Sequence, residues 1–479
     1  MSRRKNISVN QLVEQAKCLD KSGHTSKALQ TIYNFVERII TEPLCTSQVY
    51  GSKALDTLCQ NIGEYNLQRL PPVQIEPSTD LPSYVYIVTK IQKSGGHTRV
   101  IEDFISARPK AKHIILATGL AGPSDQHYLL DGLGKQIAIS FEQADGNYQQ
   151  RLTWLQQHLL TINAKKVYLF NHHQDSVAVA AIQPVMNLDA YFCHHGDHHL
   201  CLGVYLEHLT HVDLHPMGYN CCRDDLAIDN SYIPLTCADK GDRPKALPFC
   251  PSGMVTTCTA GRSNKIELPY FVSYLDMVPK ILKQTGGRHV HIGKLSPWAL
   301  WRIHWGLKRY SIPKQNFIYR PWVPSVWEAL HSYKVDLYIA SFPYGGALTL
   351  VEAMGAGVPV ALHRHMFSKI LGCIELAYPG AFCWSLPDEL LVHCSSLNPE
   401  RLSKESLTAR QHYLSFHTGE QLREILDGNL KAEPVAVELY GERSAQPDEW
   451  AIWLSNQLTI TGVLSRTAYR LAKRLQRLF

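Results

Sequence analysis

A regular alternation of strand-like and helix-like segments dominates the sequence from residue 84 onward. Apolar runs such as SYVYIVTK (83–90) and AKHIILAT (111–118) are each followed by a loop and a helix-like segment. A second series begins at MVTTCTA (254–260), after an irregular, proline-containing stretch at 235–252. Such alternation is typical of a parallel sheet covered by helices on both faces. We therefore expect two doubly wound α/β domains that face a ligand cleft beyond the carboxyl ends of their strands.

The length of the chain fits two such domains with flanking segments. A chain of 479 residues exceeds what one hydrophobic core usually serves. Residues 8–68 repeat apolar side chains at helical spacing without a second copy, which favours a helical cap over a tetratricopeptide array. We predict a helical extension at 1–70, Rossmann-like domains at 84–245 and 250–440, and C-terminal helices with a basic amphipathic tail at 441–479.

Composition and charge are those of a soluble globular protein. Apolar residues make up 45% of the chain and charged residues 19%. The formal net charge of +6 suits anionic ligands such as nucleotide phosphates, and it does not demand nucleic acid. The basic N-terminus is followed by no apolar signal-peptide core, and no segment has the run of about 18 uncharged apolar residues that a membrane span needs. We therefore expect a cytoplasmic protein with no nucleic-acid partner.

The 13 cysteines are scattered through apparent strands and helices. Without an export signal, free thiols are favoured over a disulfide framework. Cys221 and Cys222 are adjacent, which does not suit two separate CxxC sites, so a structural zinc site is the minor alternative. We predict no metal site.

The final segment, VLSRTAYRLAKRLQRLF (463–479), has the pattern of a basic amphipathic helix. Leucine and alanine side chains share one face, and arginine and lysine side chains lie mostly on the other. Such a helix can lie on an anionic membrane surface or pack its apolar face on the protein. Both interpretations stay open, and the first predicts a protein on the cytoplasmic face of a membrane.

The loop after the first strand of the first domain contains a glycine pair. Gly95 and Gly96 allow a tight turn and a close approach of the backbone to a ligand, and a helix follows them. The helix start offers free N–H groups that suit a phosphate or sugar hydroxyls. His97 is harder to explain by packing alone. We therefore regard Gly95, Gly96 and His97 as candidate site residues.

Four histidines and an aspartate follow the strand-like LDAYFC, in the run His194–His199. A histidine beside an aspartate suits general-base catalysis near neutral pH, which makes His195, Asp197 and His198 candidates. Metal binding is the second interpretation, in which His172 and His173 could serve as further ligands. The third interpretation is that these histidines are structural and not catalytic. We favour the general base or substrate contact.

The segment Gly293–Pro297 follows the strand-like RHVHI in the second domain. Lys294 comes directly after that strand and just before a helix. An ammonium group at this place can hold a diphosphate as a point charge. The alternative is a solvated surface lysine.

The segment SFPYGGALTLVEAMGAGVPVALH (341–363) carries the most specific pattern. We expect a strand to end at 341–344, a turn at Gly345 and Gly346, and a helix from about Ala347. The N–H groups of that helix start can bind a phosphate. Glu352, one turn beyond Thr349, can accept hydrogen bonds from ribose hydroxyls.

This segment resembles the GT-B glycosyltransferases, whose C-terminal domain often carries GG-x-x-T-x-x-E-A-x-x-x-G-x-P-V at the donor nucleotide-sugar. The matching residues are Gly345, Gly346, Thr349, Glu352, Ala353, Gly357, Pro359 and Val360. The Lys294 segment is similar to the phosphate-binding lysine of the O-GlcNAc transferase and HMW1C-like group. Gly95–Thr98 resembles the glycine loop of bacterial GT-B enzymes, and His195–His198 resembles an H-A-D-H segment of related enzymes. The resemblance covers roughly residues 84–430.

The resemblance implies a glycosyltransferase of the hexosyltransferase type. It implies an acceptor-side first domain, a second domain that binds a nucleotide-sugar, and no required cofactor. UDP is the expected nucleotide, and the acceptor is a glycan, a lipid-linked glycan or a protein. Polysaccharide biosynthesis fits such an enzyme. The implied donor-site residues are Gly95, Gly96, Lys294, Tyr344, Gly345, Gly346, Thr349 and Glu352.

One position departs from the family pattern. Many retaining GT-B enzymes have a second glutamate eight residues before the equivalent of Glu352, where this sequence has Tyr344. The departure favours an inverting reaction, which needs one general base on the acceptor hydroxyl. The candidates are Asp197, His195, His198 and His97. No metal is needed if Lys294 and the helix start at 347 neutralise the departing diphosphate.

Two other functions remain possible at this point. One is a nucleotide-sugar 2-epimerase of the same fold, which would act without an acceptor. The other is a non-catalytic, membrane-associated assembly protein, which would bind no nucleotide-sugar. The transferase explains more of the pattern than either alternative.

Overall fold

The computed structural model describes residues 9–40, 50–75, 81–93, 96–133, 136–195, 199–268, 270–365 and 371–435. The described residues form two compact units. Among the described residues, the first contains those up to Leu214 and residues 218–231, and the second contains residues 215–217 and 232–435. The predicted tail helix at 463–479 and the candidates Gly95, Asp197 and His198 lie outside the described residues.

The first unit is built on a seven-stranded sheet in the order β3-β2-β1-β4-β5-β6-β7. Its strands β1 to β6 pair in parallel. All six residues of β1 are buried, as expected for a central strand that is covered on both faces. The strands are β1 (Ser83–Val88), β2 (Lys112–Ala117), β3 (Ala138–Gln143), β4 (Lys166–Phe170), β5 (Ala190–His194), β6 (Thr210–Asp213) and β7 (Asn230–Tyr232).

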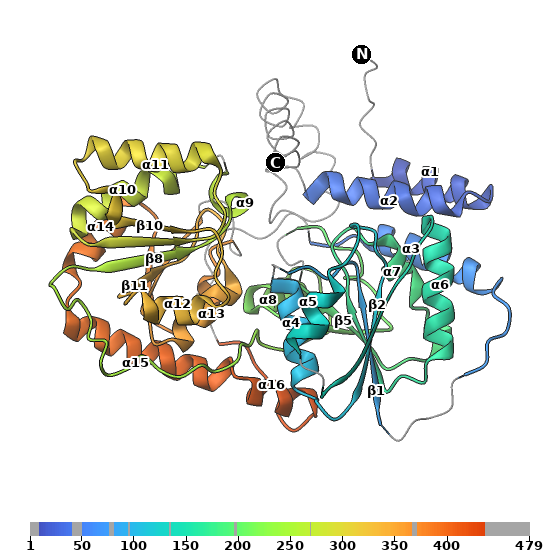
Figure 1. The fold of residues 1–479 in the computed structure, drawn as a ribbon. Helices are drawn as coiled ribbons and strands as arrows, with labels where there is room; N and C mark the ends of the chain where they lie inside the picture. Colours follow the sequence, from blue (N-terminus) through green and yellow to red (C-terminus); the bar gives the residue numbers. More distant parts are fainter. Residues whose placement is uncertain are drawn as a thin grey trace, which may run out of the picture. The chain divides into compact units, whose positions relative to one another are not determined.

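Helices cover both faces of this first sheet (Figure 1). The crossovers β1–β2 and β2–β3 place α4 (Gly96–Ser106) and α5 (Gln126–Gly132) on one face. The crossovers β3–β4 and β4–β5 place α6 (Tyr148–Thr161) and α7 (Ser176–Ala181) on the other. The helix α8 (Pro216–Asp224) follows β6. The change of face between β1 and β4 is where ligands bind in such sheets.

Three N-terminal helices form a group in which α2 and α3 pack against α6 and α7, and α1 packs on α2 and α3. They are α1 (Val9–Lys21), α2 (Thr25–Ile40) and α3 (Lys53–Leu67). The hydroxyl of Ser176 donates to the carbonyl of Leu29 at 2.9 Å, which joins α7 to α2. The buried carboxylate of Asp56 on α3 accepts hydrogen bonds from the N–H groups of Gly203 at 2.8 Å and Tyr205 at 2.9 Å. The helices therefore attach both to the helical layer and to the loop after β5.

The second unit repeats the topology of the first on a six-stranded parallel sheet in the order β10-β9-β8-β11-β12-β13. When its strands are counted from β8, this order is 3-2-1-4-5-6, the order of the dinucleotide-binding Rossmann fold. The strands are β8 (Thr256–Ala260), β9 (Arg288–Ile292), β10 (Phe317–Arg320), β11 (Leu337–Ile339), β12 (Val360–His363) and β13 (Phe382–Trp384). The prediction of two Rossmann-like sheets is confirmed.

The helices of the second unit also form two layers (Figure 1). One layer holds α10 (Tyr274–Thr285), α11 (Pro297–Arg309) and α14 (Pro387–Ser396), and the other holds α12 (Val326–Ser332), α13 (Ala347–Gly355) and α15 (Pro399–Phe416). The short α9 (Ser263–Ile266) follows β8, and α16 (Gly419–Leu426) is the last described helix. Within the ranges described, no helix combines the length and the apolar character needed to cross a membrane.

Candidate functional site

Three loops meet at the carboxyl edge of the second sheet, where β8, β9 and β11 end. A Cβ atom on Gly293 would lie 2.2 Å from the carbonyl oxygen of Gly261, and Gly293 has a φ of +127°. A Cβ atom on Gly261 would in turn lie 2.9 Å from Cβ of Ser341. The backbones of the three loops are therefore too close for side chains at these glycines. This contact brings the Lys294 segment next to the 341–346 turn, two regions that are far apart in the sequence.

Lys294 sits on a backbone that is fixed on both sides. Its carbonyl oxygen accepts a hydrogen bond from the N–H of Ser263 at 2.9 Å. Two residues later, Ser296 donates from its N–H at 2.7 Å and from its hydroxyl at 2.6 Å to the carboxylate of Glu267. The side chain of Lys294 is exposed and makes no ion pair with any part of the chain that the structure describes. Its ammonium group is thus available to an anionic ligand.

The turn before α13 presents backbone N–H groups at the same edge. Gly346 is the N-cap of α13 and has no side chain with which to cap the helix. The first N–H groups of a helix have no partner inside the helix, so they can bind an anion. A Cβ atom on Gly345 would lie 2.8 Å from Sγ of Cys373, which explains the glycine at that position. The helix starts at Ala347, as predicted.

Thr349 contributes to the turn itself. Its hydroxyl donates to the carbonyl of Gly346 at 2.9 Å and accepts from the hydroxyl of Tyr338 at 2.9 Å. Glu352 follows within α13 and is half-buried. The backbone of Tyr344 is also fixed, because its carbonyl oxygen accepts from the hydroxyl of Ser341 at 2.6 Å. Because the hydroxyl of Thr349 both donates and accepts within the protein, its hydrogen-bonding capacity is largely used there.

Lys265 is a residue that the sequence analysis missed. Its ammonium group donates to the carbonyl oxygen of Gly345 at 2.7 Å and lies beneath the turn. Burial lowers the pKa of Lys265, and the nearby guanidinium of Arg262 lowers it further. The signal in the sequence is the basic pair in Gly261-Arg262-Ser263-Asn264-Lys265, directly after a strand. The hydrogen bond holds the backbone of the turn, and the protonated form of Lys265 would add positive potential where a phosphate would bind.

The carboxyl edge of the first sheet carries a cluster of histidines. His97 lies in the first turn of α4, and its ring stacks on that of His195, with centroids 4.1 Å apart and planes at 15°. The ring of His172, after β4, lies 5.2 Å from that of His97. Sequence reasoning placed His97 and His195 in two separate loops, and the structure brings them into contact. Gly96 is the first residue of α4.

The hydrogen bonds of His97 determine its tautomer. Its Nε2 atom lies 2.9 Å from the carbonyl oxygen of Phe170, which can only accept, so Nε2 carries the hydrogen. The Nδ1 atom is then a buried acceptor, and no hydrogen-bond donor from the described parts of the chain contacts it. Burial and the neighbouring rings of His195 and His172 hold the pKa of His97 well below 6.5. His97 is therefore neutral at pH 7 and is suited to accept a hydrogen bond from a substrate hydroxyl rather than to act as a strong base.

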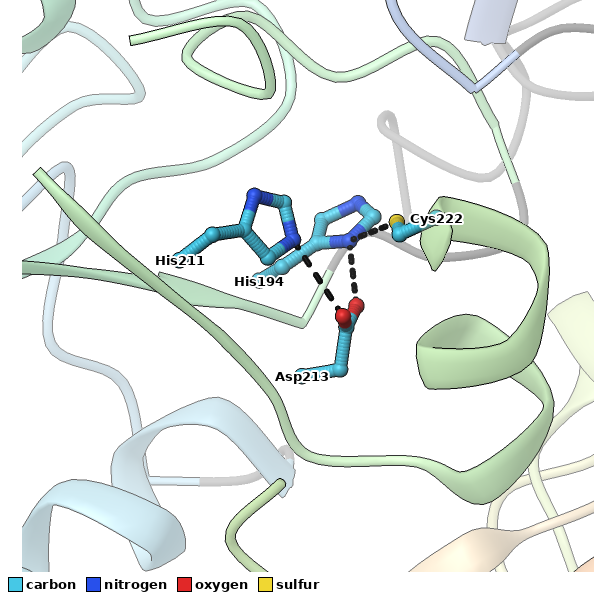
Figure 2. Close-up of side chains that lie close together, drawn as sticks. All are labelled: His194, His211, Asp213 and Cys222. Atoms are coloured by element: carbon cyan, nitrogen blue, oxygen red, sulfur yellow. Dashed lines mark hydrogen bonds and ion pairs between the residues drawn. The ribbon is translucent and has the colours of Figure 1, made fainter. Parts of the chain in front are cut away.

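A second polar cluster lies in the same unit, formed by His194, His211, Asp213 and Cys222 (Figure 2). One ligand atom from each of these four buried side chains lies within 4.8 Å of the others. The sequence analysis predicted no metal site, and it considered His194 only as part of the 194–199 run. This cluster is the group in the described residues that could hold a metal ion.

Comparison with known proteins finds likeness in structure alone. No protein-family model and no curated protein sequence matches the chain. Anabaena HepE in complex with UDP and glucose is 11% identical, with a TM-score of 0.53 over 72% of this chain and 98% of that one. A glycosyltransferase from Rickettsia africae is 14% identical, with a TM-score of 0.54 over 73% and 98%. The lipopolysaccharide outer core galactosyltransferase WaaB is 14% identical, with a TM-score of 0.50 over 73% and 100%.

These likenesses show the fold of the chain. The matches extend over 72% and 73% of this chain, and both sheets have the Rossmann strand order. The chain therefore has the GT-B fold that the motif at 345–360 led us to expect. A fold is shared by proteins of different function, so the activity has to be argued from the site.

Proposed function

We propose that the protein is a glycosyltransferase that moves a sugar from a nucleotide-sugar to an acceptor hydroxyl. The observation that carries this proposal is the uncapped start of α13 beside the exposed Lys294, at the carboxyl edge of a Rossmann-type sheet. Helix N–H groups, Lys294 and the buried Lys265 all favour a bound diphosphate. A diphosphate is also the leaving group of a nucleotide-sugar. The same groups would therefore stabilise the charge that develops during transfer.

We propose UDP as the nucleotide and no metal or cofactor for the transfer step. The structure of HepE was determined with UDP and glucose, and HepE shares the fold of this chain. Two lysines and a helix start can neutralise a leaving diphosphate, which removes the need for a metal ion at that place. Tyr344 stands where retaining relatives carry a glutamate, so we propose that the reaction inverts the configuration at the sugar carbon.

The histidine cluster of the first unit is the proposed acceptor side. No donor of the described residues contacts Nδ1 of His97, so this atom would accept a hydrogen bond from the acceptor, and His195 stacks on its ring. A base needs a pKa near the working pH, which does not fit the lowered pKa of His97. Asp197 therefore remains our first candidate for the base, with His195 and His198 as alternatives. The acceptor class is a glycan, a lipid-linked glycan or a protein.

Glu352 provides a test of the donor site. If its carboxylate accepts hydrogen bonds from the ribose, each bond contributes roughly 1.5 kcal/mol or more. Glu352→Ala should then weaken the binding of UDP about tenfold to a hundredfold, with a smaller effect on turnover. Isothermal titration with UDP measures this. Glu328→Ala, at an exposed glutamate of α12, is the matched control. Unchanged UDP affinity in Glu352→Ala would remove Glu352 from the site.

An exposed aromatic face on α11 supports a membrane location. Trp298, Trp301 and Trp305 are 53%, 62% and 53% exposed and lie three and four residues apart, on one side of the helix. Arg302 and Arg309 lie beside Trp298 and Trp305, with guanidinium carbons 5.3 and 5.7 Å from the ring centres. Tryptophan and arginine together suit the boundary between lipid head groups and acyl chains. We therefore propose peripheral attachment to an anionic membrane surface, to which residues 463–479 would add.

Vesicle binding tests this attachment. The whole chain should sediment with vesicles that contain phosphatidylglycerol and less with phosphatidylcholine alone. Replacing Trp298, Trp301 and Trp305 by serine should weaken the binding more than about tenfold, because three aromatic side chains leave the lipid boundary. Trp322→Ser, at a tryptophan that is 57% exposed outside α11, is the control. Equal binding by the triple variant and the unaltered chain would contradict a role for this face.

A further inference from the structure

We propose that His194, His211, Asp213 and Cys222 bind a structural zinc ion in the first unit. The four side chains come from β5, β6 and α8, and each is at most 5% exposed. One ligand atom of each lies within 4.8 Å of the other three (Figure 2). The inference concerns the fold of this unit and does not depend on the proposed glycosyl transfer.

The register of the sheet explains why three of these side chains converge. His194 on β5 pairs with Asp213 on β6, and Phe192 pairs with His211. His211 and Asp213 are two residues apart, so their side chains lie on the same face of the sheet. The helix α8 begins three residues after Asp213 and brings Cys222 to that face. Successive members of the cluster are 17, 2 and 9 positions apart along the chain, and the fold brings them to one point.

The contacts at His194 Nδ1 favour a ligand set over a hydrogen-bonded relay. This atom lies 2.9 Å from Oδ1 of Asp213 and 3.5 Å from Sγ of Cys222. In a cysteine–histidine–aspartate relay, the thiol and the carboxylate contact opposite ring nitrogens, which they do not do here. One N–H group can donate well to only one of these two neighbours. A cation between the three atoms would contact all of them at once.

His211 also lacks the hydrogen bonds that a buried imidazole normally makes. Its Nε2 atom is 3.3 Å from Oδ2 of Asp213, yet neither ring nitrogen makes a hydrogen bond of good geometry with the described residues. A buried polar atom without a partner costs roughly 1–3 kcal/mol. Coordination through Nε2 would satisfy this atom.

The spacing and charge of the four atoms fit zinc. Zinc binds thiolate, imidazole and carboxylate at about 2.0–2.3 Å, so neighbouring ligand atoms of a tetrahedral site lie about 3.4 Å apart. The contacts of 2.9, 3.3 and 3.5 Å are close to that value. A thiolate and a carboxylate together balance the two charges of the ion, which makes its burial feasible. The thiolate and imidazoles select against magnesium and calcium.

The surroundings of Asp213 resemble the outer shell of a metal site. The amide of Asn230 donates to Oδ2 of Asp213 at 2.6 Å and to the carbonyl oxygen of Tyr219 at 2.9 Å. Such partners orient a ligating carboxylate. With four protein ligands the site is closed, as structural zinc sites are, and it would join β5 and β6 to α8. The residue after the first ligand is His195, so the ion would also hold the start of the acceptor-side loop.

Metal content and cobalt spectra of the full-length protein test this inference. The chain purified from zinc-supplemented cells should contain about one zinc ion, and Cys221→Ala, at the adjacent buried cysteine, should retain it. Cys222→Ala and His211→Ala should lose most of it. After replacement of zinc by Co²⁺, the thiolate-to-cobalt absorption should be present in Cys221→Ala and absent in Cys222→Ala.

A chelator experiment on the unaltered chain covers the case in which these variants do not fold. A zinc chelator should lower its melting temperature, and Zn²⁺, but not Mg²⁺, should restore it. The proposal is overturned if the unaltered chain contains no zinc and takes up none when Zn²⁺ alone is added. It is also overturned if folded Cys222→Ala holds as much zinc as Cys221→Ala.

Discussion

Lys294→Ala is expected to lower the turnover of glycosyl transfer by about 10² to 10³-fold, with the fold unchanged. Removing one preformed group that stabilises developing negative charge typically costs about 3–4 kcal/mol in a desolvated site. The side chain of Lys294 is exposed and forms no ion pair within the described residues, so its loss removes no internal contact of that kind. The effect should therefore appear in turnover and diphosphate affinity and not in the melting temperature of the free protein.

The matched control for this variant is Lys308→Ala. Lys308 is an exposed lysine in the last turn of α11, the helix that begins shortly after Lys294. It should keep full turnover. Lys294→Arg should recover part of the activity, because it retains the charge but changes the geometry. If Lys294→Ala retains turnover within a fewfold of the unaltered chain, Lys294 does not contact the leaving diphosphate.

Asp197→Asn is expected to lower turnover by about 10² to 10⁴-fold while UDP binds normally. A positioned general base contributes about this much, and asparagine keeps the size of the side chain while losing its basicity. Lys265, Lys294 and Glu352 lie in the second unit, whereas Asp197 comes after β5 of the first unit in the sequence. Turnover should therefore fall without a change in donor affinity.

The control for the acceptor side is His127→Ala, at an exposed histidine of α5. It should leave turnover unchanged. If Asp197→Asn is fully active and His195→Ala is not, the base is the imidazole of His195, and our first choice is wrong. If both variants are active, His198 is the remaining candidate in the 194–199 segment, and full activity of His198→Ala as well would exclude this segment as the source of the base.

The fold was predictable because apolar runs and glycine turns recur in a regular order. The turn at Gly345 and Gly346 and the helix from Ala347 appear where the pattern placed them. The strand β3 was not predicted, since Ala138–Gln143 is an edge strand in which no residue is buried and polar residues alternate with apolar ones. Edge strands lack the continuous apolar run that marks β1.

The site was less predictable because it depends on packing between distant segments. The contact of Gly293 with Gly261 positions Lys294, and no local pattern reveals it. Lys265 was missed since its role comes from a hydrogen bond to Gly345, eighty residues away. The cluster around Asp213 was missed for a similar reason. Zinc motifs are recognised by short cysteine or histidine spacings, whereas here strand register and α8 bring the residues together.

The most direct test of the central claim is the melting temperature of the purified chain with UDP and a panel of nucleotide-sugars. A ligand that binds only the folded protein adds about 2.7 kcal/mol of stability at a hundredfold excess over its dissociation constant. We predict that UDP and at least one UDP-sugar raise the melting temperature, and that the rise is smaller in Lys294→Ala and Glu352→Ala. If no nucleotide and no nucleotide-sugar changes the melting temperature, the proposed donor site and the glycosyl transfer built on it are contradicted.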